Sequence, residues 1–301
     1  MESLRVVDAM DFGREIHYPV TRILAHERSR VQEILIAELA RFGSAKNLWI
    51  GAEIDNWKLA PQFSTHDEHR YHQMLAFPPL AALENPEDGI ILGGGDWPLA
   101  ARIAMRRGVK QVKIVDWDLL VGHLVLQHMS EIARFGVHRD PRFMFFEEID
   151  VAKFLPSRER QSADFIFGDL TDVSDLKKIA PDFLGHCFQI LRNGGFVAFQ
   201  VGAYGFTEDR IAAITEGIRD LRQAGFEAVW IWHEYIDSFG YEQCFMAGWK
   251  GVSPSTDPVS EDRFRELFDV AGDRAHYSLK IHRRAFTLDL EMEEVIARAS
   301  A

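Results

Sequence analysis

Short apolar runs separated by amphipathic stretches fill the part of the chain that follows residue 85. Seven of these runs predict strands, at Ile90–Leu92, Val112–Val115, Phe143–Phe146, Phe165–Phe167, Phe196–Val201, Val229–Trp232 and Cys244–Ala247. Apolar residues at helical spacing predict helices between most of them, among them one long helix over residues 120–132. This alternation is typical of an α/β fold with a doubly wound, mainly parallel sheet. A short loop joins the last two runs, so we expect the last strand of the seven to be antiparallel.

The first 84 residues have a different pattern, with strand-like runs at Glu33–Ala37 and Asn47–Ile50. They predict a small β-rich domain over residues 1–84, followed by a Rossmann-like domain with a C-terminal extension over residues 85–301. A helix is expected from Asp67 to Leu75 and should end before Pro78–Pro79, because proline lacks the N–H that a helix interior needs. A second helix, which starts at Phe183, should stop at the glycines of Asn193–Gly195.

Composition and charge narrow the class of protein. The chain has 301 residues, and its 34 Lys and Arg against 46 Asp and Glu give a net charge of −12. This surplus argues against a nucleic-acid partner, which needs basic surface, and is compatible with a cationic ligand. Two cysteines without a CxxC pair favour a reducing compartment. Without a long apolar N-terminal segment or an apolar run of 18 residues, we expect a cytoplasmic protein with no membrane partner.

Acidic residues follow four successive predicted strands. They are Asp96, then Asp116 with Asp118, then Asp150, and finally Asp169 with Asp172. The carboxyl ends of parallel strands meet at one edge of a sheet, where ligands of such folds bind. An acid after the second strand is placed to accept ribose hydroxyls, and Asp150 could accept the amine of an adenine. Any one of these acids could instead cap a helix or sit in solvent, but the shared edge favours a site.

The loop Gly93-Gly94-Gly95 lets the backbone approach a ligand closely. It lacks the GxGxxG spacing of dinucleotide sites and the Gly-Lys-Ser/Thr of phosphate loops, and no basic residue lies beside it. A nucleoside without phosphates therefore fits better than a nucleotide, and the S-adenosyl group is the obvious candidate.

Five segments in order along nearly the whole chain resemble the motifs of the spermidine synthase (polyamine aminopropyltransferase) family. They are Ser29–Leu35 (family SxYQxIxV), Asp67–Leu75 (DExxYHEML), Gly93–Asp96 (GGGD), Asp169–Asp172 (DSxDP, with Val173 in place of the proline) and Tyr277–Leu288 (YNxxxHxAAFxLP). The resemblance implies an N-terminal β domain packed on a methyltransferase-like Rossmann domain. It implies transfer of an aminopropyl group from decarboxylated S-adenosylmethionine to a small cationic amine, with release of methylthioadenosine. It also implies a homodimer. We expect no metal, because the histidines of residues 66–72 lack the HExxH spacing of a metal site.

The resemblance assigns roles residue by residue. The donor site would be formed by Gln32, His72, Gly93, Gly94, Gly95, Asp96, Asp116 and Asp150, with Asp116 on the ribose, Asp150 on the adenine and Asp96 on the terminal ammonium. The catalytic residues would be Asp169, Asp172 and Tyr71, with Asp169 as the carboxylate that takes the proton. The acceptor side would involve Trp97, Gln200, Tyr235 and Ser238.

The chain departs from the family pattern on the acceptor side. Trp97 follows GGGD where the family has glycine, and residues 236–241 replace the family's PTYPSG. Trp97 either narrows the ligand site or packs between the domains. These departures keep open another S-adenosylmethionine enzyme on the same fold, namely a methyltransferase, an aminocarboxypropyl transferase or a cyclase. A non-catalytic adenosyl-binding protein is the third alternative, and the presence of Asp169 and Asp172 argues against it.

Overall fold

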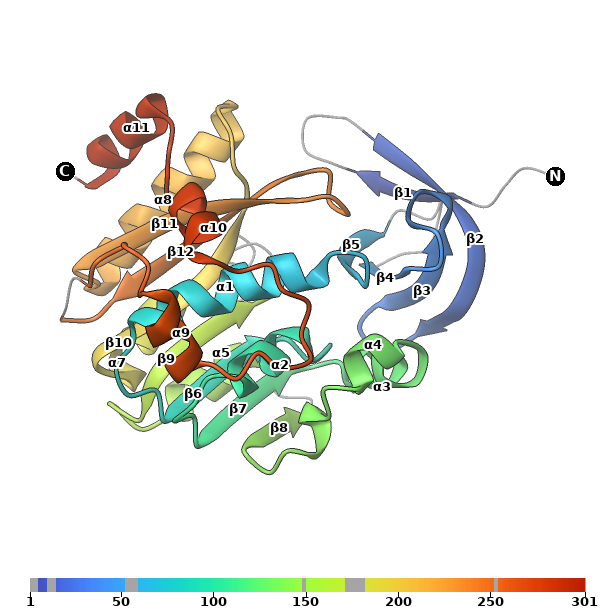
Figure 1. Ribbon diagram of the computed structural model, residues 1–301, viewed down its shortest axis with the longest axis horizontal. Coiled ribbons are helices and arrows are strands. Elements are labelled where there is room, and N and C mark those ends of the chain that lie inside the picture. Colours follow the sequence, from blue (N-terminus) through green and yellow to red (C-terminus); the bar gives the residue numbers. More distant parts are fainter. Residues whose placement is uncertain are drawn as a thin grey trace.

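The protein is built from two β-sheets that lie side by side, and helix α1 (Glu68–Ala82) lies across one face of the larger sheet (Figure 1). The computed structural model describes residues 5–9, 15–51, 59–147, 150–170, 182–251 and 254–300. Within these residues, no helix is both long and apolar enough to cross a membrane.

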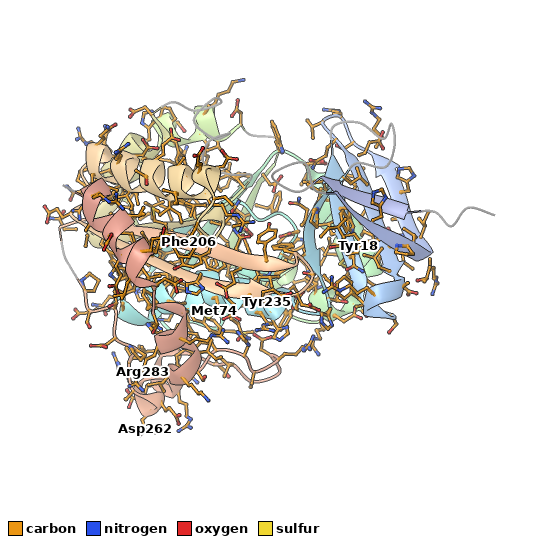
Figure 2. All side chains as sticks on the ribbon, turned by 90° about the horizontal axis from the view of Figure 1, so that it is seen from above. Tyr18, Met74, Phe206, Tyr235, Asp262 and Arg283 are labelled. Atoms are coloured by element: carbon orange, nitrogen blue, oxygen red, sulfur yellow. The ribbon has the colours of Figure 1, made fainter. Side chains whose placement is uncertain are left out.

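The N-terminal sheet has five antiparallel strands in the order of the chain. They are β1 (Arg5–Ala9), β2 (Glu15–Arg28), β3 (Glu33–Leu39), β4 (Lys46–Gly51) and β5 (Ala60–Ser64), with a short 3-10 helix η2 (Ala40–Phe42) after β3. After Glu33, strand β3 has apolar residues at consecutive positions because side chains on both of its faces are buried. Ile34 and Ile36 pack against helix α3 (Leu119–His128), whereas Leu35 and Leu39 pack on the opposite face with Tyr18, which Figure 2 labels.

The second sheet has seven strands in the order β11-β12-β10-β9-β6-β7-β8. Their bounds are β6 (Asp88–Gly93), β7 (Gln111–Asp116), β8 (Phe143–Glu147), β9 (Ala163–Asp169), β10 (Leu191–Ala203), β11 (Ala228–Ile236) and β12 (Tyr241–Trp249). Neighbours from β10 to β8 are parallel, and β12 is antiparallel to both β10 and β11. The predicted α/β fold, with its antiparallel last strand, is confirmed.

Helices cover both faces of this sheet. The remaining helices are α1 (Glu68–Ala82), α2 (Pro98–Ala104), α4 (Ser130–Ala133), η4 (Val137–Arg139), α5 (Val151–Phe154), η5 (Leu155–Ser157), α7 (Phe183–Ile190), α8 (Glu208–Ala224), α9 (Glu261–Leu267), α10 (Leu279–Ala285) and α11 (Leu290–Ser300). Because side chains alternate along a strand, Ile91 packs with α1 and α2 on one face. Ile90 and Leu92 pack with α5, α7, α8 and α11 on the other.

Helix α1 continues through Pro78 and Pro79, so the predicted helix end at Leu75 is wrong. Pro78 has no N–H to donate to the carbonyl of Met74, four residues earlier. The indole Nε1 of Trp232 on β11 donates to that carbonyl instead, at 2.8 Å. Tertiary contact thus supplies the hydrogen bond that the sequence removes, and Met74 itself lies fully buried at the centre of the molecule (Figure 2).

Two further predicted helix limits differ from the structure. The long helix over residues 120–132 is two helices, α3 and α4, because Met129 between them leaves the helical conformation at φ −114° and ψ 79°. Helix α7 ends at Ile190, and Leu191 opens β10 directly. Gly194 therefore lies within a strand, where the β10–β9 pairing shifts register between Leu191 and Phe196, and does not cap a helix.

Candidate active site

A cleft opens at the carboxyl ends of β6, β7 and β9, against the N-terminal sheet. Leu48 and Ile50 of β4 form an apolar wall on one side, and Val115 and Leu170 form one on the other. Eight of the residues predicted for the site line this cleft, namely Gln32, Gly93, Gly94, Gly95, Asp96, Asp116, Asp150 and Asp169. None of the described residues that line it is Lys, Arg or His, so the cleft is acidic and apolar.

The glycine loop closes tightly over the ends of β6, β7 and β9. Gly93 has φ 79°, and a Cβ there would lie 2.1 Å from the carbonyl oxygen of Asp169. The Gly95 N–H donates to Asp116 Oδ2 at 3.0 Å, and a Cβ on Gly95 would lie 2.7 Å from the same oxygen. Glycine is needed at both positions because a Cβ at Gly93 would meet the backbone of Asp169, and one at Gly95 would meet the carboxylate of Asp116.

Asp116 is held by backbone donors on both oxygens. Its Oδ2 accepts from Gly95, and its Oδ1 accepts from the Asp118 N–H at 2.9 Å. Burial raises the pKa of Asp116, although these backbone hydrogen bonds oppose the rise. Each carboxylate oxygen has a second lone pair, so the group keeps the capacity to accept two ribose hydroxyls.

Asp118, which the sequence placed at this edge of the sheet without a specific role, orients a donor-site residue. Its Oδ2 accepts hydrogen bonds from Gln32 Nε2 at 2.7 Å and from Ser29 Oγ at 2.8 Å, across the boundary between the two sheets. Its Oδ1 accepts from the Leu120 N–H at 3.2 Å and so caps α3. The sequence signal was present, since an acid two residues after a strand-ending acid stands where a helix N-cap is expected.

Asp150 combines the two alternatives that the sequence left open. Its Oδ1 accepts from the Ala152 N–H at 2.9 Å and caps α5, while the residue also lines the cleft. The cap uses one carboxylate oxygen, which leaves Oδ2 available to a ligand.

Asp96 and Asp169 form an acidic pair deep in the cleft. Asp96 Oδ1 is buried without a hydrogen-bond partner among the described residues. Burial and the nearby charge of Asp169 raise the pKa of Asp96 to about 8. Burial also raises the pKa of Asp169, against the opposing effects of His72 and of a hydrogen bond from Tyr71. Two half-buried acids that face a cleft wall without Lys, Arg or His among its described residues make a site for a cationic ligand.

Tyr71 and His72 reach this pair from α1. The Tyr71 hydroxyl bonds to Asp169, and its ring packs against Phe239 and Phe245 at centroid distances of 5.9 and 5.3 Å. His72 is only 2% exposed and is not among the residues of the cleft wall. It therefore acts on the cleft through its charge rather than as part of its surface.

Trp97 is a non-glycine residue in the left-handed region, at φ 83°. Its indole Nε1 donates to the Gly122 carbonyl at 3.3 Å, and its ring lies 5.3 Å from that of Phe145. It also packs against the apolar cluster that β3 shares with α3, and it is not part of the described cleft wall. Of the two alternatives for Trp97, the geometry favours packing between the domains.

The other predicted acceptor-side residues lie outside the cleft wall as described. Gln200 Oε1 accepts from the Gly202 N–H at 2.6 Å and from Gln243 Nε2 at 2.7 Å. Ser238 is buried, and its N–H donates to Asp67 Oδ2 at 2.8 Å. Tyr235 lies exposed near the end of β11 (Figure 2). Asp172 lies outside the described residues, so its place relative to Asp169 stays a prediction. No group of three or more His, Cys, Asp or Glu side chains within the described ranges is arranged to hold a metal ion.

Comparisons with known proteins show the family to which this chain belongs. Residues 68–238 match the family model of the spermine/spermidine synthase domain. A polyamine aminopropyltransferase of Sulfolobus acidocaldarius is 30% identical over 94% of this chain and 90% of its own length. That of Pyrobaculum neutrophilum is 28% identical over 93% and 96%. The crystal structure of spermidine synthase from Thermotoga maritima has the same fold, with a TM-score of 0.81 at 18% identity over 99% of this chain and 96% of that one. The chain therefore belongs to the spermine/spermidine synthase family, whose curated relatives named above are aminopropyltransferases.

Proposed function

We propose that the protein transfers the aminopropyl group of decarboxylated S-adenosylmethionine to a small cationic amine and releases methylthioadenosine. The observation that carries this proposal is the pair of half-buried carboxyl groups in the cleft, Asp96 and Asp169, beside two acids suited to a nucleoside. A donor with a sulfonium and a terminal ammonium supplies the positive charge that the described cleft wall lacks.

The arrangement of acids favours one orientation of the donor. Asp116 accepts the ribose hydroxyls and Asp150 the adenine amine, since both line the cleft and their carboxylates keep lone pairs beyond those used by the backbone donors. Oδ1 of Asp96, which has no hydrogen-bond partner in the described part of the chain, then receives the ammonium of the aminopropyl group. The carboxylate of intact S-adenosylmethionine would meet this acidic pair and be repelled, which favours the decarboxylated donor over methyl transfer.

The chemical step forms a carbon–nitrogen bond and breaks a carbon–sulfur bond. The amine lone pair attacks the methylene next to the sulfonium, and the sulfur leaves with the bonding electrons as the neutral thioether methylthioadenosine. The protein must align the amine and receive its proton. A free alkyl ammonium and an ordinary aspartate differ by about 6 pKa units, or about 8 kcal/mol. Burial narrows this gap because it raises the pKa of Asp169, and Tyr71 holds the carboxylate in place.

Product analysis tests this proposal. We expect methylthioadenosine when the protein is incubated with decarboxylated S-adenosylmethionine and a panel of amines that includes putrescine. S-Adenosylhomocysteine from the intact donor would instead indicate a methyltransferase, and methylthioadenosine from the intact donor would indicate aminocarboxypropyl transfer or cyclisation. Either result, without turnover of the decarboxylated donor, contradicts the proposal.

A variant pair connects turnover to Asp169. Asp169→Asn should lower kcat by about 100- to 10,000-fold and leave methylthioadenosine binding close to wild type. Asp262→Asn is the matched control, since Asp262 lies on the surface helix α9 with its side chain 91% exposed. Unchanged turnover in Asp169→Asn would exclude the role given to this carboxylate.

A further inference from the structure

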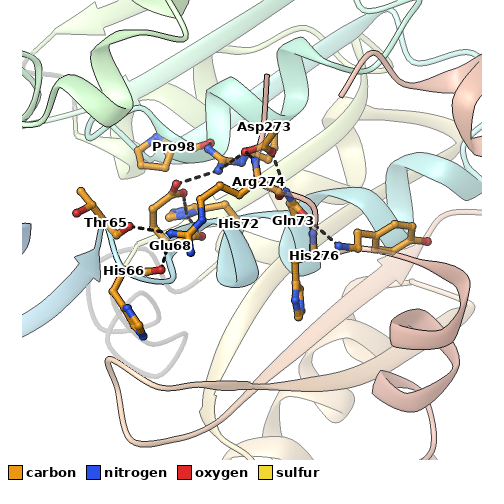
Figure 3. A network of polar contacts seen from close by, with 11 residues as sticks. Thr65, His66, Glu68, His72, Gln73, Pro98, Asp273, Arg274 and His276 are labelled. Atoms are coloured by element: carbon orange, nitrogen blue, oxygen red, sulfur yellow. Dashed lines mark hydrogen bonds and ion pairs between the residues drawn. The ribbon is translucent and has the colours of Figure 1, made fainter. Parts of the chain in front are cut away.

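A segment near the C-terminus, residues 273–277, crosses helix α1 and is tied to it by one side chain (Figure 3). Gln73 Nε2 donates to Asp273 Oδ2 at 2.8 Å and to the Arg274 carbonyl at 2.7 Å. Gln73 Oε1 accepts from the N–H groups of His276 and Tyr277, at 3.2 and 2.8 Å. The segment is therefore fixed against the helix that carries Tyr71 and His72.

Asp273, the first residue of this segment, also belongs to a row of buried charged side chains. Arg102 on α2 has a fully buried side chain that lies 3.0 Å from Asp273 Oδ1 and 2.9 Å from Glu68 Oε1. The side chains of Asp273 and Glu68 are only 2% and 7% exposed. One guanidinium thus stands between two carboxylates, and it cannot fully neutralise both.

The second oxygen of Glu68 connects this row to His72. Glu68 Oε2 lies 3.3 Å from His72 Nδ1 and has no hydrogen-bond donor of its own among the described residues. His72 Nδ1 is also 2.7 Å from the Glu68 backbone carbonyl. A carbonyl only accepts, so Nδ1 carries a hydrogen, and the charge of the ring depends on whether Nε2 carries one as well.

The groups around His72 favour the doubly protonated ring. Glu68 and Tyr71 face it from α1, Asp96 from the loop after β6 and Asp169 from the end of β9, and Arg102 stands behind Glu68. Burial opposes a charge on His72, but contact with Glu68 and the charges of Asp169 and Asp96 outweigh it and raise the pKa of His72. The imidazolium then stands beside the catalytic carboxylate and favours its ionised form.

We propose that Asp273 is a positioning residue for the reaction: it shares the positive charge of Arg102 with Glu68, so that Glu68 keeps negative charge with which to hold His72 as an imidazolium beside Asp169. This inference rests on the proposed function only for the role of Asp169. Loss of the Asp273 charge would leave Arg102 paired with Glu68 alone, and the imidazolium would lose part of its counter-charge. The effect passes through two intervening side chains and does not require Asp273 to touch a substrate.

Nuclear magnetic resonance of the unliganded protein with ¹³C-labelled histidine directly tests this series of contacts from Asp273 to His72. The His72 resonance is identified by its absence in His72→Gln. We expect its titration midpoint to lie above that of a free histidine and to fall by about one pH unit in Asp273→Asn. Asp262→Asn, the surface control, should leave it unchanged. In steady-state kinetics the high-pH limb of kcat/KM should move down by the same amount, whereas a purely structural loss would lower the rate equally at all pH values.

Each possible result for the His72 titration midpoint either supports or overturns the inference about Asp273. A wild-type midpoint below that of a free histidine overturns the inference without need of a variant, which covers the case in which Asp273→Asn does not fold. A midpoint unchanged in folded Asp273→Asn overturns it as well. Asp273→Glu keeps the charge and should restore the wild-type midpoint. A shifted midpoint in a protein without aminopropyl transfer would contradict only the proposed function, and normal transfer with an unshifted midpoint would contradict only this inference.

Discussion

Gln32, in the turn between β2 and β3, donates a 2.7 Å hydrogen bond to Asp118 at the start of α3, so a residue that does not line the cleft orients one that does. We expect Asp118→Ala to raise the donor KM by about tenfold, equivalent to about 1.4 kcal/mol, because Gln32 is freed. Loss of the helix cap should cost about 1 kcal/mol of stability in addition. Asp118→Asn keeps an acceptor oxygen and serves as the control. Equal donor KM values for Asp118→Ala and wild type would show that Gln32 needs no such support.

Asp96 should couple donor binding to proton release. Its pKa of about 8 means that the free protein carries a proton there at neutral pH, and a bound ammonium favours the ionised form. Binding of the decarboxylated donor at pH 7 should therefore release close to one proton, and binding above pH 9 close to none. Calorimetry in buffers of different ionisation enthalpy measures this number. Asp96→Asn should abolish the release, and an unchanged value would assign the proton to another group.

The same carboxyl should make stability depend on pH. Its pKa is 3.8 as the ordinary value and about 8 in the folded protein. Between these values the folded protein holds a proton that the unfolded chain has lost, so the stability contributed by this group falls as pH rises. Asp96→Asn removes the effect, and its Tm should exceed that of wild type by a margin that grows from pH 5 to pH 8. A constant margin would mean that the carboxyl titrates normally.

Trp97 should support the fold rather than bind the donor. Trp97→Gly relieves a left-handed backbone at φ 83°, worth about 1 kcal/mol, but removes the contact with Phe145 and the packing against α3. Loss of a large partly buried side chain costs about 3 kcal/mol, so the net change should be destabilising. Urea unfolding measures the loss, and the methylthioadenosine Kd should stay near wild type. A much weaker Kd in the folded variant would restore the ligand-contact alternative.

Trp232 should stabilise the proline-containing helix through its hydrogen bond to Met74. Trp232→Phe leaves a buried carbonyl without a donor, which costs about 1 to 3 kcal/mol. Trp249→Phe is the matched control, because Trp249 is equally buried but its Nε1 has no hydrogen-bond partner among the described residues. The difference between the two variants in chemical denaturation isolates the hydrogen bond. If both lose the same stability, the indole of Trp232 contributes by packing alone.

The positions of the nucleoside acids were predictable from sequence because they follow from topology. Parallel strands bring residues such as Asp116 and Asp169 to one edge whatever the details of packing. The continuation of α1 through Pro78 was not predictable, since the donor to Met74 comes from a tryptophan 158 residues away. The row of charges from Asp273 to Glu68 could not be predicted from the sequence for the same reason. Asp273 and Arg102 are 171 residues apart, and no local sequence pattern relates them.

The apolar contact between β3 and α3 has a consequence for how the protein unfolds. Ile34 and Ile36 share one buried cluster with Leu124 and Val125, and the nearby Lys46–Glu131 ion pair joins the same two parts at 2.7 Å. Separating the sheets would expose apolar surface on both sides, so neither part should melt alone. Heat or urea should therefore abolish nucleoside binding and secondary structure in a single transition, and a fragment that starts after residue 84 should aggregate through the bared face of α3.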